Sequence, residues 1–136
     1  MTLLVKTFLK ESTIPKAGIG CFAGEPIKKG VKIWQYNPVI DKVYTSEEFD
    51  SITGLEKDFL KMYCYKNRGK YILCVDNARF FNHSIECNTF DTNDFEDELL
   101  NATYAGRDIA EGEEILSDYR TFGTKEDLEF NYDIGV

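Results

Sequence analysis

Residues 79–84 read Arg79-Phe80-Phe81-Asn82-His83-Ser84, and Asn88 follows shortly after them. This stretch brings an arginine, two aromatic rings, amides and the chain's single histidine into one short span. Such a density of polar groups beside aromatic rings is unusual for a hydrophobic core. A purely structural interpretation is open, in which Asn82 and Asn88 cap turns and His83 is a satisfied structural residue. The flanking segments decide between structure and function.

Upstream, the turn-forming stretch Ile14-Pro15-Lys16-Ala17-Gly18-Ile19-Gly20 places two glycines around one residue. Glycine lets a backbone approach a ligand closely and adopt positive φ, which leaves amide N–H and C=O groups available to bind it. Taken alone, a Gly-x-Gly pattern between two strands more often marks a plain turn. It becomes informative only together with the other segments.

Downstream, Gly112-Glu113-Glu114-Ile115-Leu116-Ser117-Asp118-Tyr119 predicts a tight turn that leads into a short strand ending at a tyrosine. Tyr119 could simply be an amphipathic residue at a strand edge. Glu113 and Glu114 resemble an acid–base pair, but adjacent residues on a strand point to opposite faces. They cannot flank one glycosidic bond, which excludes a two-carboxylate glycosidase mechanism.

In this order and spacing, the three segments resemble the motifs of SET-domain lysine methyltransferases, over roughly residues 12 to 119. The resemblance implies a mainly β (α+β) fold of small curved sheets, with a short helical insert and a C-terminal segment that threads through a loop to form a pseudoknot. It also implies a single SET domain over residues 1–136, with the insert at about 45–63 and a lid segment at about 120–136.

The implied activity is transfer of a methyl group from S-adenosylmethionine to a lysine side chain, for example of a histone, without a metal and with S-adenosylhomocysteine as product. Tyr119 is the implied catalytic residue. The resemblance assigns cofactor binding to Lys16, Ala17, Gly18, Gly20, Arg79, Asn82, His83 and Tyr119. An alternative from another class is a catalytically silent SET-like module that binds a peptide or partner; the intact Tyr119 and Asn82-His83 favour the enzyme.

Departures from the family pattern affect particular expectations. Cys87 stands where proline usually precedes the asparagine, and Ser117 stands where an aromatic residue often narrows the lysine channel. Candidates for lining that channel are Tyr36, Tyr104 and Ser117, with Tyr65 and Tyr71 as further aromatic residues. No cysteine occurs in residues 88–136, so we do not expect these residues to include the cysteine-rich segment that follows the domain in many chromatin enzymes. The tail residues Phe122, Phe130 and Tyr132 could form another lid or simply pack against the domain.

Composition restricts the partners. At 136 residues the chain is expected to form one core, and its formal net charge of −8 opposes extended contact with nucleic acid. A lysine-containing basic peptide such as a histone tail is the expected partner; the alternative interpretation is that the acidity serves solubility. A homodimer is compatible with so small a domain, but nothing in the chain indicates one.

Lysines interrupt the apolar residues 1–10 and no small-residue cleavage site follows, so we expect no signal peptide; nor does any stretch of about 20 apolar residues occur that could span a membrane. The four cysteines are scattered, without a Cys-x-x-Cys pair, which favours buried free thiols over a zinc site or disulfides. We therefore expect an intracellular protein, cytoplasmic or nuclear, that is not secreted.

The hydrophobic patterns predict one domain dominated by short strands. Apolar residues at three- and four-residue spacing predict helix over residues 45–63, broken in two near Gly54. The acidic residues 91–98 predict a solvated loop. Strands are expected at 3–9, 19–23, 31–36, 71–75, 99–105 and 114–116.

Overall fold

The computed structural model describes residues 3–92, 102–121 and 130. Within these residues the chain forms short strands, two α-helices and two 3-10 helices. The strands are β1 (Thr7–Glu11), β2 (Ile19–Ala23), β3 (Lys32–Gln35), β4 (Lys42–Tyr44), β5 (Cys64–Asn67), β6 (Lys70–Leu73), β7 (Asn82–His83), β8 (Thr89–Thr92), β9 (Ala102–Ala105) and β10 (Leu116–Ser117). The helices are α1 (Ser46–Ser51), α2 (Gly54–Tyr63), η1 (Asn77–Phe80) and η3 (Tyr119–Thr121).

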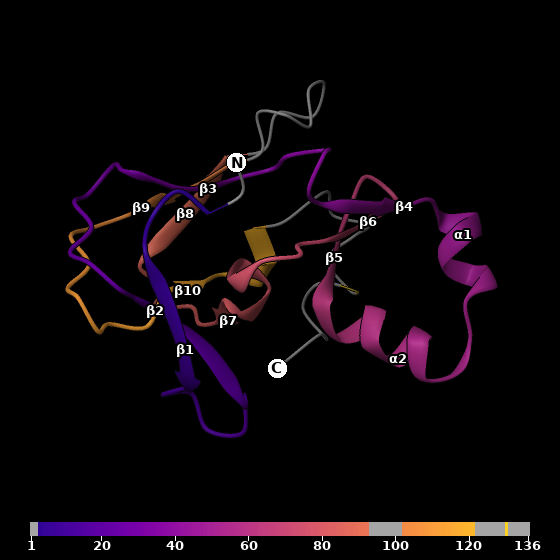
Figure 1. The fold of residues 1–136 in the computed structure, drawn as a ribbon, viewed down its shortest axis with the longest axis horizontal. Helices are drawn as coiled ribbons and strands as arrows, with labels where there is room; N and C mark the ends of the chain where they lie inside the picture. Colours follow the sequence, from indigo (N-terminus) through magenta and orange to yellow (C-terminus); the bar gives the residue numbers. More distant parts are fainter. Residues whose placement is uncertain (1–2, 93–101, 122–129, 131–136) are drawn as a thin grey trace.

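The described strands form four small sheets instead of one large one. Strands β1 and β2 make an antiparallel hairpin, and two three-stranded antiparallel sheets have the orders β3-β9-β8 and β4-β6-β5. Strands β7 and β10 pair in parallel between them (Figure 1). The predicted mainly β fold of small sheets is confirmed.

Two short helices occupy the region of helical periodicity, at one end of the molecule beside β4 and β6 (Figure 1). The Thr45 side chain caps α1 in a capping box with Glu48, which satisfies backbone groups that the first turn leaves unpaired. Phe49 in α1 and Leu60 in α2 are buried on the inner faces of the two helices. The break falls just before Gly54, which begins α2 with φ of 70°.

Some element boundaries differ from those that the sequence predicts. The first strand runs over Thr7–Glu11 instead of 3–9, and Leu3 instead makes an isolated bridge to Trp34. Residues 91 and 92 belong to β8, so the prediction of a loop is wrong there, because they pair with Ala102–Thr103. The rest of the predicted loop, 93–98, and the start of the predicted strand at 99–101 lie outside the described residues.

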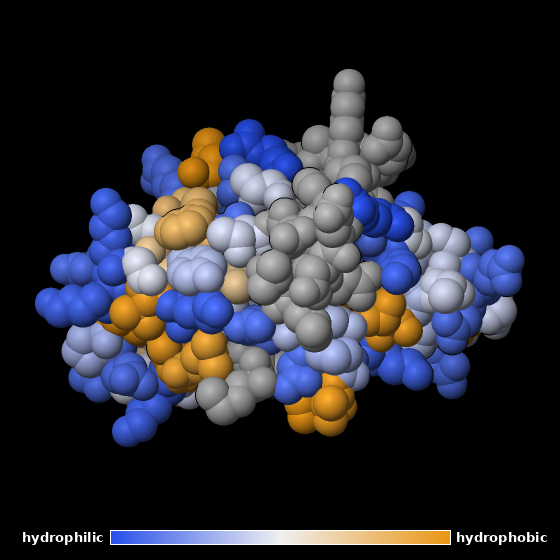
Figure 2. Space-filling view, turned by 90° about the horizontal axis from the view of Figure 1, so that it is seen from above, coloured by the Kyte–Doolittle hydropathy of each residue, from blue (hydrophilic) through white to orange (hydrophobic). Residues whose placement is uncertain are grey.

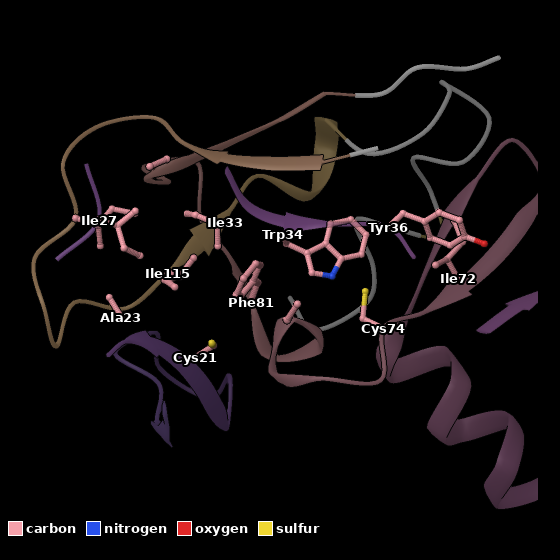
Figure 3. Packing of buried hydrophobic residues seen from close by; sticks show 13 residues of the cluster. Cys21, Ala23, Ile27, Ile33, Trp34, Tyr36, Ile72, Cys74, Phe81 and Ile115 are labelled. Atoms are coloured by element: carbon pink, nitrogen blue, oxygen red, sulfur yellow. The ribbon is translucent and has the colours of Figure 1, made fainter. Parts of the chain in front are cut away.

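The buried side chains gather in two clusters. The larger one runs from Ala23 and Ile27 past Phe81 and Trp34 to Ile72 (Figure 3). A smaller cluster packs the helices on sheet β4-β6-β5. All four cysteines are free thiols, and three of them are buried. On the face seen in Figure 2, apolar residues outside the grey region form separate patches among polar ones.

Neither α1 nor α2 approaches the length and hydrophobicity of a membrane-spanning helix, and the rest of the described chain contains none either.

Candidate active site

The parallel pair β7–β10 joins the two most chemically distinctive segments of the sequence. Asn82 lies opposite Leu116 and His83 lies opposite Ser117. The Ser84 N–H continues the ladder by donating to the Ser117 carbonyl at 3.0 Å. Because a parallel pair needs a long crossover, residues more than 30 positions apart in sequence now share one site.

Side chains stabilise the other edge of β10. The buried amide of Asn88 accepts from the Leu116 N–H at 2.9 Å and donates to the Glu114 carbonyl at 2.7 Å. The Thr89 hydroxyl donates to the Leu116 carbonyl at 2.8 Å and lies 3.2 Å from the Ser117 hydroxyl. These two residues take the place of a neighbouring strand.

The His83 ring orients the residues that follow β10. Its Nδ1 accepts a hydrogen bond from the Tyr119 N–H at 3.0 Å, so the neutral ring carries its proton on Nε2. Burial lowers the pKa of His83, and the Arg120 charge lowers it further, while Asp118 at 3.9 Å acts in the opposite direction. The histidine is therefore neutral at physiological pH.

Tyr119 begins η3, and its hydroxyl donates to the carbonyl of Phe81, immediately before Asn82. Its ring tilts against the His83 ring with centroids 5.2 Å apart. Burial raises the pKa of Tyr119 well above its usual value, and the Glu114 charge contributes to the rise. The hydroxyl consequently stays protonated, and the bond to Phe81 fixes its orientation.

The glycine-containing turn also reaches this site. The Asn82 Nδ2 donates to the Ile19 carbonyl at 3.0 Å, which attaches β7 to the start of β2. The turn closes through the Ser12 N–H, which donates to the Gly18 carbonyl at 2.8 Å. Within it, Gly18 has φ of 79° and Lys16 has φ of 66°, a backbone conformation that non-glycine residues seldom adopt.

Glu114 is a member of this site that the sequence analysis missed. It is 4% exposed, and its carboxylate accepts from the Ser12 hydroxyl at 2.7 Å, the Thr13 N–H at 2.8 Å and the Asn82 amide at 3.2 Å. The Thr13 hydroxyl donates to it as well. Glu113, its neighbour, points to the opposite face and pairs with Arg107, which lowers the pKa of Glu113 to about 2.

Gly20 makes room for the Glu114 carboxylate. A Cβ added at Gly20 would lie 2.4 Å from the Glu114 Oε2 and 3.2 Å from the Ser12 Cα. The close approach that a glycine in a strand suggests is therefore made to a protein carboxylate. A glycine inside a predicted strand was therefore a sequence signal that could have indicated this close contact.

We expect Gly20→Ala to lower the free energy of unfolding by about 2 kcal/mol, because either the carboxylate or the turn must shift. Urea unfolding at neutral pH measures the loss. Gly106→Ala is the matched control, since its Cβ would meet only ordinary contacts of 3.5 Å or more. Equal stability of the two variants would contradict the role assigned to Gly20.

Of the other predicted site residues, Arg79 and Tyr36 lie apart from this network, whereas Ser117 lies within it. The Arg79 guanidinium stacks over the rings of Phe80, Tyr63 and Phe59, at 4.9, 5.2 and 5.9 Å from their centroids, and so connects η1 to α2. Tyr36 is buried in the large core cluster. Ser117 is buried on β10 beside His83.

Tyr104 is separated from Ser117 by the sheet itself. On β9 it stacks on Phe90 with ring centroids 5.4 Å apart, whereas its neighbour Thr103 bonds Asp91 on the other face. Thr89, which contacts Ser117, shares that second face with Asp91 because residues two apart on a strand point the same way. Tyr104 and Ser117 are thus not brought together.

Among the tail residues, Phe130 packs edge-on against Phe49 and Tyr71, with centroids 5.7 and 4.9 Å away. Phe130 therefore contributes to the smaller core cluster. Phe122 and Tyr132, the other lid candidates, lie outside the described residues. In the described part of the chain, histidine, cysteine and carboxylate side chains form no group of three that could hold a metal.

Asp91 adds a titratable group on the inner face of β8. Burial raises its pKa to about 6; hydrogen bonds from Thr103 and Thr121 act in the opposite direction, and the Asp118 charge adds to the rise. Between its ordinary value of 3.8 and about 6, the folded chain holds a proton that the unfolded chain has lost. Ionisation of Asp91 therefore reduces stability as pH rises through this range.

We expect Asp91→Asn, which keeps the acceptor for Thr103, to be more stable than the wild type above pH 6 by on the order of 1–3 kcal/mol. The gain should shrink as pH falls toward 4 and disappear at about pH 3, below the ordinary pKa of 3.8, where Asp91 is protonated in both states. Thermal unfolding across this pH range measures it. Asp58→Asn, on the exposed face of α2, controls for the loss of one negative charge; a gain independent of pH would contradict the assignment.

Comparison with known proteins identifies the family. The sequence profile described as SET domain matches residues 18–120, which include Gly18 and Gly20, the Asn82-His83 strand and Tyr119. The chain belongs to the SET domain family. No curated protein sequence matches it significantly.

Solved structures share its fold at low sequence identity. The apo Polycomb repressive complex 2 of Chaetomium thermophilum, with mutations in Ezh2, matches with a TM-score of 0.70 and 21% identity over 87% of this chain. The same complex bound to S-adenosylmethionine matches with a TM-score of 0.68 and 22% identity over 94%. This chain spans only 15% and 17% of those two chains.

A candidate histone methyltransferase of Plasmodium falciparum is more similar in size. It matches with a TM-score of 0.61 and 23% identity, over 86% of this chain and 95% of its own. These similarities establish a SET-like fold. They agree with the family assignment from the sequence profile.

Proposed function

We propose that this protein is a lysine methyltransferase that uses S-adenosylmethionine as methyl donor. The observation that carries the proposal is the Tyr119 hydroxyl, protonated and fixed on the Phe81 carbonyl, beside the Asn82-His83 strand. A packing role alone would not require this set of aligned polar groups to meet at one place. The bound donor in one structural neighbour supports the same choice.

The residues present fit the methyl donor chemically. No residue in the described ranges hydrogen-bonds to the Asn82 Oδ1, which leaves an acceptor for an ammonium group beside the turn of residues 12–18. Lys16 in that turn is exposed and could pair with a carboxylate. Asn82, His83 and the backbone of residues 16–20 would hold the donor. When bound, it supplies an electrophilic methyl group on a sulfonium.

The protein's part in catalysis would be alignment and polar stabilisation. An in-line displacement needs the lysine amine, the methyl carbon and the sulfur in one line, and such positioning can contribute several kcal/mol. The Tyr119 hydroxyl oxygen would stabilise the methyl group as it transfers. The amine must be neutral, and an apolar channel would lower its pKa from about 10.4, so no histidine base is required.

We propose as substrate a lysine in a basic protein segment, with a histone tail as the first candidate. The formal net charge of −8 favours encounter with cationic segments. Structural neighbours named as histone methyltransferases support the same class. A histone substrate would place the protein in the nucleus or, before histone import, in the cytoplasm.

We further propose that residues 1–136 form one SET domain. Helices α1 and α2 would be its insert, residues from about 120 onward its lid, and the C-terminal segment that pairs with β7 its pseudoknot. Association of two copies into a homodimer remains a prediction, which sedimentation would test.

The direct test combines binding and transfer. Calorimetry with S-adenosylmethionine measures donor binding, and labelled donor with core histones and mixed cellular protein measures transfer. Label on lysine would establish the activity. Binding without transfer to any substrate would favour the silent module, and a protein that does not bind the donor at all would refute the proposal.

A further inference from the structure

Glu114 connects three parts of the chain that the proposed function places around the methyl donor. Its carboxylate accepts from Ser12 and Thr13 in the glycine-containing turn and from Asn82 on β7. It also lies against Gly20, where no larger residue would fit without displacement. Ser12 and Thr13 are about a hundred residues away in sequence, so this contact exists only in the folded protein.

The carboxylate is buried without an ion pair. Of the arginines and lysines in the described residues, none pairs with Glu114, and hydrogen bonds alone compensate its charge. Burial acts to raise the pKa of Glu114, but the bonds from Thr13, Ser12 and Asn82 outweigh it and leave the pKa below its ordinary value. The group is therefore a charged acceptor at neutral pH, which strengthens each bond.

These bonds hold a strained turn and a side chain whose orientation matters. Lys16 has φ of 66°. Two backbone hydrogen bonds hold the turn around it: the Ala17 N–H donates to the Ile14 carbonyl at 3.2 Å, and the Ser12 N–H donates to the Gly18 carbonyl. Asn82 donates through Nδ2 to both Glu114 and the Ile19 carbonyl, which leaves its Oδ1 pointing away from both. An acceptor at position 114 thus determines which way the Asn82 amide faces.

We propose that Glu114 is a positioning residue for the methyl donor, holding the 12–18 turn and the Asn82 amide in the arrangement that binds it. This inference rests on the proposed function. Glu114 touches neither the donor nor the lysine in this account; it acts through Asn82 and the turn backbone. Loss of the carboxylate should weaken donor binding more than the transfer step.

Glu114→Gln tests the idea with almost no change in size. The glutamine oxygen can still accept from Thr13, but its NH2 group would face the NH2 group of Asn82. If Asn82 rotated its amide to restore that bond, its oxygen would face the Ile19 carbonyl. We expect the dissociation constant for S-adenosylmethionine to rise roughly tenfold to a hundredfold, with kcat at saturating donor within about threefold of wild type.

Glu113→Gln is the matched control, because Glu113 is adjacent but points to the opposite face, toward Arg107. It should bind the donor as the wild type does. If Glu114→Gln bound the donor normally and lost only melting temperature, Glu114 would be merely structural and the proposal would fail. Should Glu114→Gln not fold, Thr13→Val removes one donor from an exposed residue, and unchanged donor affinity in that variant would refute the proposal.

Limited cleavage with endoproteinase Lys-C provides a readout that needs no donor. Lys16 is exposed in the turn, and Lys28, exposed in another turn, serves as the internal reference. Cleavage after Lys16 should be faster in Glu114→Gln, relative to Lys28, than in the wild type. An unchanged ratio would argue against control of the turn by Glu114. If the wild type binds no donor, the proposed function fails and this inference fails with it. If the wild type binds the donor and Glu114→Gln binds it equally well, only this inference fails.

Discussion

Tyr119→Phe should lower kcat for methyl transfer on the order of a hundredfold, while changing the dissociation constant of S-adenosylmethionine by less than about threefold. The substitution removes only the hydroxyl, which donates to the Phe81 carbonyl and is protonated at physiological pH. The ring would remain against His83, and the Tyr119 N–H would still donate to Nδ1. The loss should therefore appear in the transfer step.

Single-turnover transfer at saturating donor, with binding measured separately by calorimetry, distinguishes these two effects. Tyr44→Phe is a suitable control, because Tyr44 lies on β4 in the sheet that packs against the helices. It should transfer at the wild-type rate. Equal rates for Tyr119→Phe and the wild type would remove Tyr119 from the chemistry and favour another residue near the Asn82-His83 strand.

Local patterns predicted the parts of the fold that depend on local physics. Strand β2 occupies the predicted residues, because the turn before it and the buried residues within it are both visible in the sequence. The helical periodicity likewise identified α1 and α2, with Phe49 buried. Strand β8 was not predicted, because its last two residues, Asp91 and Thr92, read as the start of a polar loop; the pairing with β9, which gives Asp91 a partner in Thr103, is visible only in the structure.

The candidate site was predictable only as a set of motifs. The resemblance placed Asn82, His83 and Tyr119 together, and the β7–β10 pair does bring them together. Glu114 was considered as part of the third segment and as half of an excluded acid–base pair, but it was not predicted as a site residue. Its partners Ser12 and Thr13 are ordinary turn residues in the sequence, and no local pattern indicates a contact over a hundred positions.

Other predictions were limited by side-chain direction. Tyr104 was a channel candidate because it is aromatic, but strand alternation places it on the face opposite Thr103. Arg79 sits within the second motif, yet its guanidinium stacks on aromatic rings of α2. A sequence motif does not by itself show where each side chain points.

Asn88→Ala should be more destabilising than any substitution discussed so far, lowering the free energy of unfolding by roughly 3 kcal/mol and the melting temperature by about 10 °C. Asn88 is 2% exposed, and its amide satisfies the Leu116 N–H and the Glu114 carbonyl on one edge of β10. Truncation leaves both backbone groups buried without a partner. Since β10 carries Tyr119 into the site, transfer activity should fall with the stability.

Asn77→Ala is the matched control, because that amide makes only one long bond of 3.3 Å, to the Thr7 hydroxyl, and is partly exposed. Asn77→Ala should lower the free energy of unfolding by less than about 1 kcal/mol. Thermal unfolding of both variants in the same buffer measures the difference between their melting temperatures. If Asn88→Ala melted at the same temperature as Asn77→Ala, the amide would not be what stabilises β10.

Asn88→Asp separates the hydrogen bonds from the volume of the side chain. An aspartate is nearly the same size and can still accept from the Leu116 N–H, but a carboxylate oxygen would then face the Glu114 carbonyl and the Glu113 carboxylate, which lies 3.4 Å from the Asn88 Nδ2. We expect this variant to be at least as unstable as Asn88→Ala at neutral pH and to recover part of the loss in acid, where the new carboxyl is protonated and can donate. A stable Asn88→Asp protein would mean that filling the space, and not donating to the strand, is what the site requires.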